Sequence, residues 1–331
     1  NLTSQLNQHY NFRTVDSKTD IPENIDVLLV SGGVDSGEEN TVNNLTSFLS
    51  AGKKILMPQS GVNTDIQLQQ AFPIESNIFD FLNEYDLDLQ KNLVLDSKCG
   101  NVQVQQSVGL FRMNRAVQYP FFPVVDTFNS KDSVTGIIVD KLEQILPLFP
   151  SEIKIDTVRS EKVLNVSTLF TSSNNSGLMS SNFMLSPDPQ QNPFLQLLGQ
   201  SGKVLSALSS LRGGGELMLI SDSKFLSDEG GMSIPDNMVF LMNAVDYLAD
   251  DEDLISLRSR EVTSRPLDIL QLSDEEELSI SQDDKDKKAD RIKKRWKLAN
   301  LVLPSILIIG FGILRIRKEK NQAEVLKQIY D

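Results

Sequence analysis

The segment 216–231, ELMLISDSKFLSDEGG, contains the residue types from which a catalytic or ligand-binding site can be built. An apolar run that predicts a buried strand ends at Ile220, and Asp222 and Ser223 follow almost at once. Ligands of α/β proteins usually bind where strands end, at the carboxyl edge of the sheet. Three hypotheses arise for Asp222 and Ser223: a catalytic pair, the rim of a binding cleft, or only the turn at which a strand ends.

Catalysis by Ser223 would require a general base, and the sequence offers few candidates. The only histidine, His9, lies in a polar N-terminal stretch, and the only cysteine, Cys99, lacks the strand–nucleophile–helix turn of a hydrolase. These two counts also exclude most zinc sites, and the acidic residues after Asp222 do not follow the calcium-loop pattern. We therefore predict a protein that is not an enzyme, with no catalytic residue, no metal ligand and no cofactor.

Ser31, Gly32 and Gly33 end another apolar run and form a second candidate strand-end site. They match neither G-x-G-x-x-G nor a phosphate loop ending in Gly-Lys-Ser/Thr. The backbone angles of a turn are sufficient to explain the two glycines. If Ser31, Gly32 and Gly33 form a binding site, we expect them to lie opposite Asp222 and Ser223 across a cleft.

The charge of the chain restricts its partners. Residues 1–290 carry 22 basic and 42 acidic groups, a net charge of −20, whereas residues 291–331 carry a net charge of +7. An acidic globular part of this kind repels the phosphate backbone of nucleic acids. We therefore expect no nucleic-acid partner.

The elements that would position these residues alternate between strand and helix patterns. An apolar strand at 25–33, an amphipathic helix at 38–50 and a second apolar strand at 53–59 predict a βαβ unit with parallel strands. The further expected strands are Phe12–Val15, 92–96, 153–156, 163–170 and the hairpin of 203–211 with 217–221, and the further helices are 78–89 and 237–249. The methionines Met238 and Met242 of the last helix are predicted to fill the core.

A membrane anchor is the strongest pattern in the C-terminal part. Residues 298–314 are uncharged and span about 26 Å as a helix, near the lower limit for crossing a bilayer. A buried core helix is the alternative, but the flanks favour a bilayer: Lys294, Arg295, Trp296, Lys297, Arg315, Arg317 and Lys318 suit the headgroup region. Basic residues flank both ends, so the positive-inside rule does not fix the orientation.

The expected organisation is built from these segments. Residues 1–270 form an α/β domain, either as one body or as two halves, 1–115 and 116–270. The acidic residues 271–290 form a tether, 291–314 the basic-flanked membrane helix, and 315–331 a short cationic tail. The sequence begins at Asn1, and we expect an upstream segment to precede it.

Several blocks, in this order, resemble a known family. The blocks are IDVLLVSGG, FLSAGKKILMP, FLNEYDLDLQKNLVLD and ELMLISDSKFLSDEGG followed by NMVFLMNAVDYLADDEDLISLRSR, and they cover most of the chain. They look like the extracytoplasmic domain of gliding-motility-type (GldG-like) ABC transporter auxiliary proteins. The basic-flanked apolar segment near the C-terminus completes the similarity.

The resemblance implies a fold, a location and partners. The fold is a mainly parallel sheet with flanking helices, similar to class I glutamine amidotransferases or to flavodoxin-like halves, followed by one transmembrane helix. The domain lies outside the inner membrane with its tail in the cytosol, and its partners are an ABC-2-type permease and a separate ATPase. Apart from this resemblance, the alternative function is that of a degenerate or unrecognised α/β hydrolase-like enzyme with a site near Ser31 and Asp222.

Overall fold

The structure is a computed structural model that describes residues 2–16, 19–30, 34, 39–108, 111–128, 133–139, 142–156, 158–188, 191–192, 194–228 and 230–251, together with Arg295, Phe311 and Arg315. The chain divides into two compact units. One consists of residues 1–104 and 116–262, and the other of residues 105–115 and 263–331. The first unit contains the central sheet and both candidate strand-end segments.

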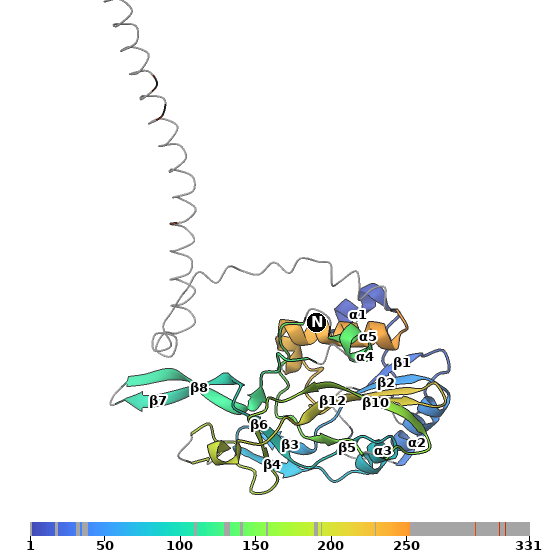
Figure 1. The fold of residues 1–331 in the computed structure, drawn as a ribbon, viewed down its shortest axis with the longest axis horizontal. Coiled ribbons are helices and arrows are strands. Elements are labelled where there is room, and N and C mark those ends of the chain that lie inside the picture. Colours follow the sequence, from blue (N-terminus) through green and yellow to red (C-terminus); the bar gives the residue numbers. More distant parts are fainter. Residues whose placement is uncertain are drawn as a thin grey trace, which may run out of the picture. The chain divides into compact units, whose positions relative to one another are not determined.

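The centre of the first unit is a sheet to which the described residues contribute seven strands (Figure 1). Their order is β1, β2, β13, β12, β9 and β5, and β10 also pairs with β12. Their bounds are β1 (Val27–Leu29), β2 (Lys54–Pro58), β5 (Asp88–Leu89), β9 (Ile153–Lys154), β10 (Val163–Thr171), β12 (Val204–Leu211) and β13 (Glu216–Ile220). Strands from both parts of the chain, before and after residue 115, therefore build one sheet.

The pairing in this sheet is mixed, which corrects the expectation of a mainly parallel sheet. β1, β2 and β13 run parallel to one another, but β12 is antiparallel to β13, β10 and β9, and β9 is antiparallel to β5. The expected hairpin explains part of the difference. β12 and β13 are joined by a short glycine turn, in which Gly214 has a φ of +86°, and strands joined by such a turn pair antiparallel.

Smaller two-stranded sheets accompany the central one. β3 (Val62–Asp65) pairs antiparallel with β4 (Gln70–Pro73), and β6 (Leu93–Asp96) pairs antiparallel with β11 (Ser176–Met179). β7 (Cys99–Val108) pairs with β8 (Phe111–Pro123). The two prolines of β8, Pro120 and Pro123, therefore lie in a two-stranded sheet, in which each strand is an edge strand and can accommodate proline.

Helices cover both faces of the central sheet (Figure 1). The α-helices are α1 (Leu2–His9), α2 (Glu39–Ser50), α3 (Ile78–Glu84), α4 (Ser133–Ile138) and α5 (Pro235–Leu248), and the 3-10 helices are η1 (Phe194–Leu197) and η2 (Gly231–Ser233). Residues of α1, α4 and α5 pack on one face, and residues of α2 and α3 on the other. The parallel strands β2 and β13 are thus apolar because they are covered on both sides.

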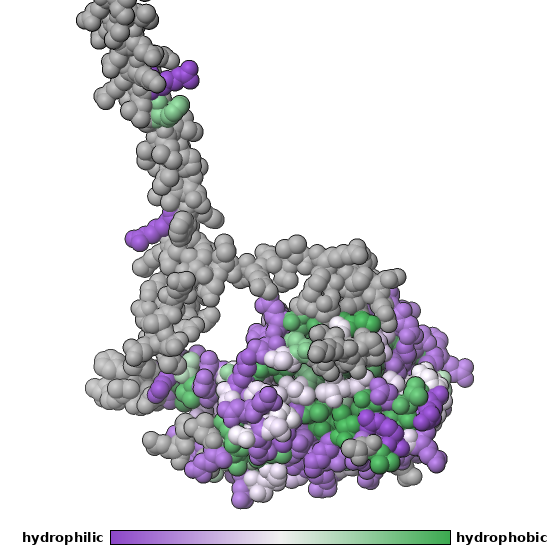
Figure 2. Space-filling model, in the orientation of Figure 1, coloured by the Kyte–Doolittle hydropathy of each residue, from purple (hydrophilic) through white to green (hydrophobic). Residues whose placement is uncertain are grey.

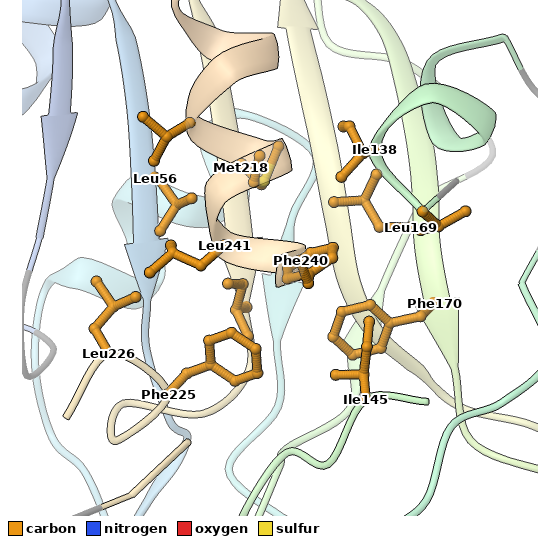
Figure 3. Packing of buried hydrophobic residues seen from close by; sticks show 14 of the residues in the cluster. Leu56, Ile138, Ile145, Leu169, Phe170, Met218, Phe225, Leu226, Phe240 and Leu241 are labelled. Atoms are coloured by element: carbon orange, nitrogen blue, oxygen red, sulfur yellow. The ribbon is translucent and has the colours of Figure 1, made fainter. Parts of the chain in front are cut away.

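The packing under α5 shows why this helix closes the fold. Pro235 begins the helix, where its missing N–H costs nothing, and apolar side chains then recur on the face that meets the sheet. Phe240 contacts Phe170 and Phe225 edge-on, with ring centroids 5.4 and 5.9 Å apart (Figure 3). Met242 is buried in the same cluster and Met238 packs against it, which confirms that both methionines fill the core.

Two local predictions differ from the structure. Residues 11–16 form no regular element, so the predicted strand Phe12–Val15 is wrong. A run with strand-forming residues becomes a strand only when a neighbouring strand satisfies its backbone. The helix predicted at 78–89 ends at Glu84, because Asp88 and Leu89 pair with β9 instead.

The membrane segment predicted at 298–314 lies outside the described residues, apart from Phe311. The same holds for its predicted flanking residues Lys294, Trp296, Lys297, Arg317 and Lys318, whereas Arg295 and Arg315 are described and are exposed. Within the described part of the chain, no helix has the length and apolar character needed to span a bilayer. On the face drawn in Figure 2, apolar residues of the first unit lie in patches separated by polar residues.

Candidate functional site

The ends of β2 and β13 bring two polar segments to the same edge of the sheet. These strands are parallel neighbours, and the Gln59 N–H donates to the carbonyl of Ile220 at 2.9 Å, which continues the ladder past the last strand residues. Ser60 and Ser223 therefore come together, as parallel topology requires of residues that follow adjacent strands.

Asp222 is a buried carboxylate that holds two loops. Its side chain is in the protein interior, with the residue only 1% exposed. Oδ2 accepts the N–H of Leu148 and Oδ1 the N–H of Lys224, both at 2.8 Å. Burial raises the pKa of Asp222 to about 7, although these two hydrogen bonds and the nearby Lys224 act in the opposite direction. Both carboxylate oxygens are thus engaged in holding backbone.

Ser223 and Ser60 connect the two strand ends directly. The Ser223 N–H donates to Ser60 Oγ at 2.9 Å, and the Ser60 hydroxyl donates to Ser223 Oγ at 3.2 Å. The contact joins residues 163 positions apart in the sequence. The hydroxyl of Ser223 is paired with another hydroxyl rather than with a general base, so the arrangement lacks the activated nucleophile of a hydrolase.

Asn237 completes the polar arrangement from the first turn of α5. Its Oδ1 accepts the N–H of Leu146 at 2.9 Å, and its Nδ2 donates to the carbonyl of Leu146 at 2.9 Å and to that of Gly231 at 3.1 Å. Asn237 and Asp222 together hold the backbone at Leu146 and Leu148. The sequence did not reveal Asn237 as part of this site, because its partner lies 91 residues away.

The second candidate segment, Ser31, Gly32 and Gly33, lies outside the described residues. The described residues on either side of this segment hydrogen-bond to β2 and to the residue that follows β2. The Val30 N–H donates to the carbonyl of Leu56 in β2 at 3.0 Å, and the Val34 N–H donates to Oε1 of Gln59, the residue after β2, at 2.5 Å. A cleft between this segment and Asp222–Ser223 therefore stays a prediction.

The other nucleophile candidate is poorly placed for chemistry. Cys99 is partly buried at the start of β7, and burial raises the pKa of its thiol to about 11. A thiol that stays protonated at neutral pH is a weak nucleophile. His9, the only histidine of the sequence, is an exposed residue of α1. In the described ranges, His, Cys, Asp and Glu form no group of three that could hold a metal ion.

Two hollows lie away from these strand ends. One, of about 1480 Å³, follows β1 and is also lined by residues 10–16 and by parts of α2 and α5. The other, of about 500 Å³, lies between β4 and residues 182–186. Neither is lined by Asp222 or Ser223. No sequence pattern indicates either hollow, because each is formed by segments that are distant in the chain.

The described part of the chain is a mixed α/β domain in which Asp222, after the end of β13, and Asn237 of α5 hydrogen-bond to the backbone of neighbouring loops. The sequence of residues 1–244 matches the ABC transporter auxiliary family, described as "ABC-type uncharacterized transport system". The chain belongs to this family. The family name marks an auxiliary component of an ABC-type transport system.

Individual relatives add little to the family assignment. An uncharacterized protein of Borreliella burgdorferi is 23% identical over 93% of this chain, and the match covers 60% of that protein. The chain thus spans about three fifths of the length of this relative. A solved structure, the mmIFT52 N-terminal domain, is 12% identical and superposes with a TM-score of 0.47, covering 75% of this chain and 88% of that one.

Proposed function

We propose that this protein is a non-enzymatic, membrane-anchored auxiliary subunit of an ABC-2-type transporter, similar to the GldG-like proteins of gliding motility. Residues 1–270 lie outside the inner membrane and bind a substrate or a partner. Residues 298–314 cross the bilayer, and residues 315–331 form the cytosolic tail. A permease and a separate ATPase supply the pore and the hydrolysis of ATP.

The family match over residues 1–244 is the observation that carries this proposal. The uncharged run at 298–314, with basic residues at both ends, supports the anchor. The net charge of −20 on residues 1–290 supports partners other than nucleic acid. The GldG-like subclass rests on the order of the sequence blocks, which the family match does not resolve.

The site geometry supports a non-enzymatic function. A hydrolase near Ser31 and Asp222 would need Asp222 to exchange protons with a substrate or a base. Both of its oxygens instead accept backbone N–H groups inside the protein, and Ser223 bonds to Ser60.

Co-purification tests the proposed assembly. The affinity-tagged full chain, extracted in mild detergent from cells that express it at native level, is expected to bring down a permease and an ATPase. The matched control replaces residues 298–314 with an unrelated apolar helix of equal length and keeps both basic flanks. This control separates specific assembly through the anchor from assembly through residues 1–270. Recovery of the full chain without any transporter subunit, after chemical crosslinking in the membrane, would contradict the proposal.

A further inference from the structure

Among the described residues, β1 is an edge strand of the central sheet and pairs on one side only, with β2. The Val30 N–H donates to Leu56 O and the Lys54 N–H to Asp26 O, so alternate residues of this run face β2. Successive residues of a strand direct their backbone groups to opposite sides. The N–H and C=O groups of Val27 and Leu29 therefore point away from the sheet, and among the described residues none is found to bond to them.

The 1480 Å³ cavity lies along the other side of β1 and extends to both faces of the sheet. It is lined by Val27 and Leu29, by Leu45 of α2 on one face, and by Val245 and Leu248 of α5 on the other. The core clusters of the two faces confirm that α2 and α5 lie on opposite sides. The cavity thus occupies the position that the next strand of the sheet would take.

The helices determine which side chains such a strand needs. The inner strands β2 and β13, covered on both faces, are almost wholly buried and carry apolar residues at consecutive positions. A strand beside β1 would be covered by α2 on one face and α5 on the other. Its side chains must therefore be apolar at consecutive positions rather than at alternate ones.

The charges of the lining point to an uncharged occupant. The three cations of the described lining already have partners: Arg13 bonds to Asn24, Lys53 pairs with Asp26 at 2.6 Å, and Lys54 pairs with Asp250. The two remaining carboxylates of the lining, Asp16 and Asp228, also have partners. A charged side chain that entered would lose its hydration without gaining one of these groups. The complement of this lining is therefore neutral.

Residues 11–16 of the chain itself line the cavity but do not suit this position. They are held at either end, where Tyr10 Oη donates to Asp246 Oδ1 at 2.6 Å and Asn44 Nδ2 donates to Thr19 O at 3.0 Å. Side chains of a strand point alternately to the two faces of the sheet, and Arg13 and Asp16 are three positions apart. A strand at 11–16 would therefore direct one charged side chain to each of the two helix-covered faces.

We propose that the free edge of β1 is a docking site for an extended, uncharged and continuously apolar segment of a partner polypeptide, which adds to the sheet as a strand. Addition of a strand to an exposed sheet edge is a common mode of peptide recognition, in which main-chain bonds supply affinity and side-chain pockets supply specificity. The proposal deepens the proposed function, on which it rests for the source of the segment, a subunit of the transporter. The site itself is formed by described residues between Thr3 and Asp250.

A peptide of defined chemistry tests the site. The probe is acetyl-Lys-Val-Ile-Val-Leu-Lys-amide, whose four central residues are apolar and whose lysines provide solubility. The peptide is added to the full chain reconstituted in lipid nanodiscs. Empty nanodiscs measure, and correct for, partition of the peptide into lipid. Amide hydrogen exchange of Val27 and Leu29 is the readout, and we expect the saturating probe to slow it at least about tenfold.

Two controls identify strand pairing. The same peptide with N-methylated valines keeps its side chains but loses N–H groups, and its affinity is expected to fall at least about tenfold. The variant Leu29→Pro removes an N–H that β2 does not use, so it should lose the peptide. Because the Leu29 side chain packs against the cluster under α5, its unfolding midpoint should fall, and binding is measured under conditions where the variant is folded. Val158→Pro, at an 81% exposed position, should bind as the native chain does.

Several results would overturn the proposal. Exchange of Val27 and Leu29 that stays unchanged with saturating probe excludes the site, and equal protection by the N-methylated peptide excludes main-chain pairing. Protection of both amides before any peptide is added shows that the chain itself covers the edge. These outcomes need no protein variant, so the test stands even if Leu29→Pro fails to fold. They also leave the co-purification result unaffected, which separates failure of the site from failure of the proposed assembly.

Discussion

At the scale of single residues, Asp222 shows how burial changes the meaning of a motif. In the sequence it resembles a catalytic acid after a strand, whereas in the structure it is a buried acceptor for two backbone N–H groups. Its raised pKa, about 7, would suit proton transfer, but the carboxylate lines neither described cavity. The same shift therefore appears as a dependence of stability on pH.

We expect the stability contributed by Asp222 to fall as the pH rises. Its folded pKa, about 7, lies above the value near 4 of an unfolded aspartate, so the folded state binds one more proton between these values. The free energy of unfolding should be highest at the acid end of this window and fall by up to about 1.4 kcal/mol per pH unit until pH 7. Denaturant titrations of the full chain at pH 5, 6, 7 and 8, compared with Asp222→Asn, isolate this contribution. Parallel pH curves for the two proteins would contradict the assignment.

At the scale of elements, local pattern predicted the parts of the fold that are made locally. The unit of 25–33, 38–50 and 53–59 is present as β1, α2 and β2 with the expected parallel pairing. The hairpin β12–β13 is also present. The strand predicted at 153–156 is present as β9, whereas β5 has two residues, is defined only by its pairing with β9, and lies where a helix was predicted. No periodicity can be read from a run that short.

The candidate site was predictable only in part, for the same reason. The end of β13 was identifiable from Ile220 and Asp222. The contacts that give Asp222 and Asn237 their roles join residues 74 and 91 positions apart, at Leu148 and Leu146. Such contacts depend on how distant segments pack, which the residue types at the site do not encode.

α5 provides a quantitative test at this scale. Phe240 is fully buried against Phe170 and Phe225, so Phe240→Ala removes two ring contacts and leaves a cavity. We expect a loss of about 3–5 kcal/mol in the free energy of unfolding. Val239, the preceding residue, is 38% exposed, and Val239→Ala should cost less than about 1 kcal/mol. Denaturant unfolding of both variants measures the difference. Equal losses would show that α5 does not pack through this face.

At the scale of the whole molecule, the chain combines opposite charges with one apolar run. Residues 1–290 carry a net charge of −20, and residues 291–331 carry +7 around the uncharged segment 298–314. Basic groups on both sides of a membrane helix do not determine its orientation. The charges of the sequence therefore leave the orientation open, and only the resemblance to the GldG-like proteins implies one. The proposed function requires residues 1–270 to be outside and the tail inside.

Cysteine labelling tests this orientation. Cys99 is a poor reporter because burial raises its pKa to about 11, so the labelled chains carry Cys99→Ser. Val158→Cys reports on the globular unit, since Val158 is 81% exposed, and Gln322→Cys reports on the tail.

With a membrane-impermeant maleimide, and with the outer membrane opened where cells have one, we expect Val158→Cys to react in intact cells. Gln322→Cys should react only after the inner membrane is permeabilised. The reverse pattern would place the globular unit in the cytosol and contradict the proposed function, while reaction of both cysteines in intact cells would show that residues 298–314 do not span the bilayer.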